Sequence, residues 1–233
     1  MAEIIFVTNM EAHYVGMRDA LNTIENKVIS NAVEVIQIND SEQWNSYWQQ
    51  KLQTAGFFFC TWMGTGLSCD YLKKASAFLQ KQKQCHLFDI IDPGDDKMDY
   101  GLQEEQKSLL KQYLACGGLL NYQNLCLYLI DTFTQRRTAY KLPEQLPWCG
   151  IYHPEFKHEF GELDAYLAKH YDSSKPTVGF IFSREDWLWQ RLAYQNEIIR
   201  AVEAQNCNVI AVFSTTMPNE KTGAVSLTTA FER

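Results

Sequence analysis

Three side chains that could bind a metal lie close together in the second half of the chain. Cys149, His153 and His158 form the pattern C-x3-H-x4-H. A thiolate together with imidazoles suits zinc or cobalt. The same segment also fits a structural role, in which His153 is held by hydrogen bonds beside a turn made rigid by Pro154. Because the segment has no regular periodicity, we assign none of the three as a metal ligand.

A second candidate is Arg184, which follows an apolar run at residues 176–182 and precedes a helical pattern. At such a junction between a strand and a helix, a guanidinium can pair bidentately with a carboxylate of a ligand. The alternative is that Ser183 or Asp186 caps the helix while Arg184 lies at its rim. The residue types alone leave both interpretations open.

A glycine-containing turn, Met63-Gly64-Thr65-Gly66, follows an apolar run in the first half of the chain. A helix that begins after such a turn can hold an anion at its N-terminus. The spacing matches neither the dinucleotide-binding fingerprint nor the P-loop. A phosphate site and a simple tight turn are therefore the two interpretations of this segment.

The first 135 residues alternate between apolar runs and helical stripes. The strand-like runs lie at residues 4–7, 33–38, 56–60 and 85–90. The helical stripes between them include Met17, Leu21, Ile24 and Val28 in one helix and Leu72, Ala75 and Leu79 in another. This order predicts an α/β protein whose first domain is a Rossmann- or flavodoxin-like parallel sheet with flanking helices.

The remaining sequence suggests a division into three parts. A helical pair at residues 102–135 completes a first domain of residues 1–135. Residues 136–175 are predicted to be a linker that contains the turn Gly150-Ile151-Tyr152-His153-Pro154. Residues 176–233 hold two strands and one helix, which is the beginning of a second, truncated α/β unit. Two strands do not make a stable sheet alone, so this unit either docks on the first sheet or belongs to a longer protein.

The overall charge and the cysteines exclude several classes of function. Lys and Arg number 21 against 28 Asp and Glu, which gives a net charge of −7. A nucleic-acid partner is not expected, because binding the phosphate backbone needs clustered cations. The apolar runs are too short to span a bilayer, and the seven cysteines form no C-x-x-C pair. We expect a cytoplasmic protein with reduced thiols and no membrane span.

Three segments in a fixed order resemble the N-terminal region of the CobN-type cobaltochelatase large subunit, a relative of the magnesium chelatase H subunit. They are the glycine-asparagine helix at 117–125, the GIYHP turn at 150–154 and the strand PTVGFIFSR at 176–184, which leads into a helix and the strand NVIAVF at 208–213. The resemblance covers roughly residues 50–215.

The resemblance implies ATP-dependent insertion of Co²⁺ or Mg²⁺ into a tetrapyrrole of the cobalamin or chlorophyll type, which makes the parent protein a ligase that forms nitrogen–metal bonds. In this family the large subunit binds the macrocycle, and separate AAA+ subunits hydrolyse ATP. The family's metal-inserting side chains lie in later parts of its chain. This chain is therefore expected to be an N-terminal fragment that is inactive alone, with no catalytic residue and no cofactor of its own.

The fragment is expected to contribute to binding of the macrocycle, together with the rest of its own chain. Tyr152, His153 and Arg184, which match the family motifs, are expected contacts of a porphyrin or corrin ring. Trp187, which follows the last motif, is a fourth expected contact. After Arg184 many family members carry a histidine or glycine-rich stretch, whereas this chain has Glu185-Asp186-Trp187. The side chains that this loop offers for ligand contacts therefore differ from those of many family members.

Two other functions remain as alternatives. The chain could be a standalone α/β module without enzymatic activity that binds a small anionic ligand, or a partner protein through the helical pair at 102–135. A flavodoxin-like redox domain would need a phosphate loop rich in Ser and Thr after the first strand. Thr8-Asn9-Met10-Glu11-Ala12 does not supply one.

Overall fold

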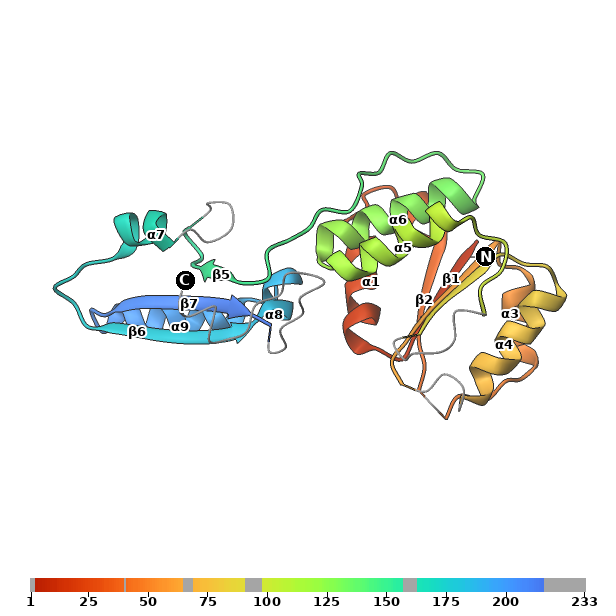
Figure 1. Ribbon diagram of the computed structural model, residues 1–233, viewed down its shortest axis with the longest axis horizontal. Coiled ribbons are helices and arrows are strands. Elements are labelled where there is room, and N and C mark those ends of the chain that lie inside the picture. Colours follow the sequence, from red (N-terminus) through yellow and green to blue (C-terminus); the bar gives the residue numbers. More distant parts are fainter. Residues whose placement is uncertain (1–2, 40, 65–68, 91–97, 157–162, 216–233) are drawn as a thin grey trace. The chain divides into compact units, whose positions relative to one another are not determined.

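The computed structural model describes residues 3–39, 41–64, 69–90, 98–156 and 163–215. The chain forms two compact units, Met1–Glu144 and Gln145–Arg233 (Figure 1). The boundary between the two units lies inside the segment 136–175 that the sequence suggests as a linker, because part of this segment forms secondary structure of the second unit.

The first unit is built on a parallel sheet of four strands. They are β1 (Ile4–Thr8), β2 (Val33–Gln37), β3 (Phe57–Trp62) and β4 (His86–Ile90), in the order β2-β1-β3-β4. Every residue of the two central strands β1 and β3 is buried, as expected for strands covered on both faces. The predicted α/β fold with a parallel sheet is confirmed.

Six helices accompany this sheet among the described residues. They are α1 (Glu11–Thr23), α2 (Lys27–Ser30), α3 (Ser46–Gln53), α4 (Asp70–Lys81), α5 (Glu104–Cys116) and α6 (Leu119–Phe133). Figure 1 shows α1, α5 and α6 on one face of the sheet and α3 and α4 on the other. Gly117 and Gly118 have φ values of 65° and 85°, which favour glycine and permit the abrupt turn from α5 into α6.

The prediction of one helix from Met17 to Val28 is wrong. Helix α1 ends at Thr23, and Ile24 has an extended backbone. The side chain of Asn26 then accepts hydrogen bonds from the backbone N–H groups of Val28 and Ile29, which starts the short helix α2. Val28 is 68% exposed as a result. Apolar spacing alone did not reveal this cap inside the stripe.

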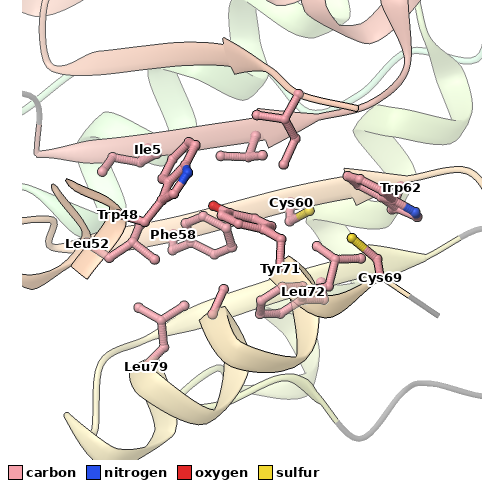
Figure 2. Close-up of a cluster of buried hydrophobic side chains, with 14 of the residues drawn as sticks. Ile5, Trp48, Leu52, Phe58, Cys60, Trp62, Cys69, Tyr71, Leu72 and Leu79 are labelled. Carbon is pink, nitrogen blue, oxygen red and sulfur yellow. The ribbon is translucent and has the colours of Figure 1, made fainter. Parts of the chain in front are cut away.

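One large core cluster fills the space between the sheet and helices α3 and α4 (Figure 2). Trp48 and Tyr71 meet edge to face with ring centroids 4.9 Å apart. Burial raises the pKa of the Tyr71 hydroxyl, which has no hydrogen-bond partner among the described residues. An unsatisfied buried hydroxyl lowers stability, because it loses its bonds to water without replacement.

Replacing Tyr71 by Phe is therefore expected to raise the free energy of unfolding by about 1 kcal/mol. Tyr113→Phe is the matched control, since its hydroxyl donates a hydrogen bond to the carbonyl of Lys141 and its loss should lower stability. Urea unfolding followed by circular dichroism measures both. A loss of stability in Tyr71→Phe would show that the hydroxyl is satisfied.

A buried polar chain joins the carboxyl ends of β1 and β3. The Thr61 hydroxyl lies 2.9 Å from that of Thr8, which also accepts a hydrogen bond from the backbone of Met10. His13 Nδ1 lies 3.0 Å from the Thr61 hydroxyl. Burial lowers the pKa of His13 from 6.5 to about 4, so its imidazole is neutral at physiological pH.

This lowered pKa predicts a pH-dependent stability. Below pH 6.5 the unfolded chain takes up a proton at His13 whereas the folded chain does not, so the free energy of unfolding falls by about 2 kcal/mol between pH 7 and pH 5. His13→Gln should lose less stability over the same range, because its side chain does not titrate. Denaturant unfolding at several pH values measures the difference. Identical pH dependence in both proteins would contradict the lowered pKa.

The described residues of the second unit form a sheet of three strands. They are β5 (Gly150–Tyr152), β6 (Thr177–Ser183) and β7 (Asn208–Ser214), in the order β5-β7-β6, with helices α7 (Leu163–His170), α8 (Arg184–Leu188) and α9 (Ala193–Ala204). Strands β6 and β7 are parallel neighbours connected through α8 and α9, and β5 pairs antiparallel with β7. Figure 1 shows α9 lying along this sheet. In the part of the chain that is described, no helix is both long and apolar enough to cross a membrane.

Candidate functional site

Two of the four expected contact residues belong to a chain of aromatic rings in the second unit. Tyr152 on β5 meets Phe182 on β6 edge to face, with ring centroids 5.9 Å apart. Phe182 pairs in register with Phe213 on β7. Trp187 on α8 stacks on Phe213 with centroids 4.2 Å apart and an interplanar angle of 4°. Tyr152 and Trp187 are both partly exposed at the two ends of this chain.

The Tyr152 hydroxyl connects β5 to helix α9. It donates a hydrogen bond of 2.8 Å to Asn196 Oδ1. Burial raises the pKa of this hydroxyl, so it stays protonated and keeps its role as a donor. The position of the Tyr152 ring is therefore fixed by a polar contact as well as by packing.

Both ring nitrogens of His153 are occupied by other groups of the protein. Its Nδ1 accepts a hydrogen bond from the backbone N–H of Glu155 at 3.2 Å, and its Nε2 lies 3.0 Å from Glu203 Oε1. Since a backbone N–H only donates, Nδ1 carries no hydrogen, and Nε2–H donates to the carboxylate. The side chain is 2% exposed. In this arrangement His153 positions the turn after β5 and has no free nitrogen for a ligand.

Arg184 binds the backbone of the segment that leads into this unit. Its Nε donates to the carbonyl of Pro147 at 2.7 Å, and a terminal nitrogen donates to the carbonyl of Leu146 at 3.1 Å. The guanidinium also lies 4.0 Å from the centre of the Trp148 ring, in cation–π geometry. Arg184 is 4% exposed. These contacts hold residues 146–148 against the start of α8.

The four expected residues thus fall into two pairs. Tyr152 and Trp187 present partly exposed aromatic surface, whereas His153 and Arg184 are buried and bind other parts of the same unit. Ser183 caps α8 by accepting a hydrogen bond from the backbone of Glu185, which is the cap considered in the sequence. The arrangement can offer ring surfaces on a rigid support.

No group of three metal-ligating side chains occurs within the described ranges. Of the C-x3-H-x4-H pattern, His158 lies outside the described residues. His153 is occupied as stated above, and Cys149 is a free, partly exposed thiol. The geometry of the described part therefore gives no support to a metal at Cys149 and His153.

A comparison with known protein families identifies the family of this chain. A family model described as CobN/Magnesium Chelatase matches residues 111–232, just over half of the chain. This chain belongs to the CobN/magnesium chelatase family. The match covers all of the second unit's described elements together with helix α6.

Two curated proteins are similar to this chain in sequence. An uncharacterized protein of Methanocaldococcus jannaschii is 33% identical over 146 residues, which cover 60% of this chain and 11% of that protein. An aerobic cobaltochelatase subunit CobN of Pseudomonas aeruginosa is 27% identical over 126 residues, which cover 52% of this chain and 10% of that subunit. The aligned part therefore spans about a tenth of the length of these relatives.

A solved structure has a similar fold. The catalytic subunit of cobaltochelatase from Mycobacterium tuberculosis matches with a TM-score of 0.62 over 95% of this chain and 17% of that chain. The sequence identity is 14%, so this likeness concerns the arrangement of helices and strands only.

The sequence did not reveal the long-range partners of the candidate site residues. Glu203, which holds His153, is 50 residues away in sequence, and Trp148 is 36 residues from Arg184. Neither residue lies in a local motif with its partner. The aromatic pair Trp187 and Phe213 was likewise invisible, because its two rings come from a helix and a strand that meet only in the folded unit.

Arg184→Gln is expected to lower the free energy of unfolding of the second unit by about 2 kcal/mol, because it removes two buried charge-assisted hydrogen bonds and a cation–π contact. Arg200→Gln is the control, since Arg200 is exposed and its ion pair with Glu197, three residues earlier in α9, joins two exposed side chains. Hydrogen exchange of the β6 and β7 amides measures the stability of this unit directly. Equal exchange rates in the two variants would show that Arg184 does not hold the unit together.

Proposed function

We propose that this chain is the N-terminal part of a chelatase large subunit that inserts Co²⁺ or Mg²⁺ into a tetrapyrrole in the cytoplasm. The match of residues 111–232 to the CobN/magnesium chelatase family carries this proposal. The 27% identity to a subunit named as an aerobic cobaltochelatase supports it. In this proposal AAA+ partner subunits hydrolyse the ATP, and metal insertion takes place in parts of the protein beyond this chain.

The second unit contributes to binding of the macrocycle in this proposal. A flat, largely apolar ring is bound best by aromatic side chains that are already fixed in place. Trp187 is partly exposed, and its stacking on Phe213 fixes the plane of its ring. Tyr152 is fixed at the other end of the aromatic chain by Asn196. His153 and Arg184 then act as positioning residues that hold these two rings.

A standalone module that binds a small ligand or a partner protein is the competing proposal. Each unit has its own packed core, which is compatible with independent function. The two proposals differ in whether a tetrapyrrole binds to the second unit.

Binding of deuteroporphyrin IX to the isolated chain tests the proposal. Trp187→Ala is expected to weaken binding about tenfold, which corresponds to a loss of about 1.4 kcal/mol of contact. Tyr194→Ala is the matched control, because Tyr194 is a 74% exposed aromatic residue of the same unit and lies outside the aromatic chain described above. The shift of the porphyrin absorption band measures the dissociation constant.

Hydrogen exchange of the β7 amides serves as a control for folding of the Trp187→Ala protein. Equal affinity in wild type, Trp187→Ala and Tyr194→Ala would remove Trp187 from the site. Absence of any porphyrin binding by the wild-type chain would contradict a macrocycle-binding role for this region and favour the standalone module.

A further inference from the structure

An open crevice lies at the carboxyl ends of strands β1 and β2 in the first unit. Its volume is about 730 Å³. It is lined by Asn9, Gln37, Ile38, Asn39, Ser41 and Glu42. None of these residues takes part in the function proposed for the second unit.

The crevice occupies the edge of the sheet at which doubly wound folds bind ligands. In the order β2-β1-β3-β4, the neighbouring strands β1 and β3 are followed by helices on opposite faces of the sheet (Figure 1). The loops after such strands diverge, which leaves space for a ligand at their carboxyl ends. The crevice adjoins this point, because Asn9 follows β1 directly.

A network of hydrogen bonds joins the segments beside the crevice. The Asn9 side chain donates to the Met63 carbonyl at 2.8 Å and accepts from the Met63 N–H at 2.9 Å, so that it links the loops after β1 and β3. The Thr8 carbonyl accepts a hydrogen bond from Ile38, which lines the crevice, and the Thr8 hydroxyl begins the chain that leads through Thr61 to His13. A site with such support holds its shape before a ligand arrives.

The free hydrogen-bonding groups at this edge are mostly uncharged. The amide of Gln37 is exposed. Asn39 Oδ1 accepts hydrogen bonds from the backbone N–H and the hydroxyl of Ser41, and the NH₂ group of Asn39 can act as a donor to a ligand. Glu42 is the one charged side chain among the described lining residues, and one of its oxygens accepts a hydrogen bond from Trp48.

These groups disfavour an anionic ligand. The described lining contains no Lys or Arg to neutralise a phosphate or carboxylate, and Glu42 would repel it. His13 cannot supply a positive charge either, because burial keeps its imidazole neutral. Gly64, two residues after the end of β3, has a φ of 109° and therefore fits the tight-turn interpretation, whereas Thr65 and Gly66 lie outside the described residues.

We propose that this crevice binds a small uncharged molecule that carries several hydroxyl or carboxamide groups. Such a ligand matches amide and hydroxyl groups that both donate and accept hydrogen bonds. The proposal is independent of macrocycle binding, since it concerns residues of the first unit only.

Amide chemical-shift mapping on the ¹⁵N-labelled chain tests it with two pairs of probes. D-ribose and malonamide are the uncharged probes, and D-ribose 5-phosphate and malonate are their anionic counterparts. The uncharged probes are expected to shift the amides of Asn9, Asn39 and Ser41 in a saturable way. The anionic counterparts are expected to shift them at least fivefold less.

Gln37→Leu and His13→Phe are the test variants, and Gln49→Leu on the exposed face of α3 is the control. Gln37→Leu removes an exposed lining amide and should reduce the ribose shifts at least threefold, whereas Gln49→Leu should leave them unchanged. His13→Phe tests the supporting network and should reduce the same shifts. Ribose and malonamide shifts that are absent, equal to those of the anions, or unchanged in Gln37→Leu would overturn the proposal. The porphyrin experiment on the second unit is unaffected by any of these outcomes.

Discussion

Parallel pairing of strands is the constraint on which both units depend. A parallel pair needs a crossover connection, and a strand buried on both faces needs an apolar layer on each side. In the first unit this constraint explains why β1 and β3 consist entirely of buried residues and why helices cover both faces of the sheet. In the second unit it explains why β6 and β7 are joined through α9, whose Ile199 packs against Val209 and Ala211.

The apolar pattern was sufficient to predict the parallel sheet of the first unit, because long buried strands such as Phe57–Trp62 leave a continuous apolar run in the sequence. It was not sufficient for β5, which has three partly exposed residues and is defined by its pairing with β7. The break between α1 and α2 also escaped prediction, since it depends on the Asn26 side chain rather than on hydrophobic spacing.

The candidate site shows the same division between local and long-range information. The order of the motifs placed Tyr152, His153, Arg184 and Trp187 in one region, and the structure puts all four in the second unit. Their different roles follow from partners far along the chain: Glu203 binds His153, Leu146 and Pro147 bind Arg184, and Phe213 stacks on Trp187. No spacing rule connects these partners. Only the burial and the hydrogen bonds seen in the folded structure distinguish the supporting residues from the partly exposed ones.

The double hydrogen bond between Asn9 and Met63 has a consequence for how this chain can diverge. The amide of Asn9 imitates a peptide group, because it donates and accepts at once. An aspartate at this position would lose the donor, and a serine would be too short to reach both backbone atoms. Either change would therefore remove at least one of the two hydrogen bonds that join the loops after β1 and β3. The side-chain amide of Asn9 thus helps to hold the loops after β1 and β3 at a fixed distance from each other.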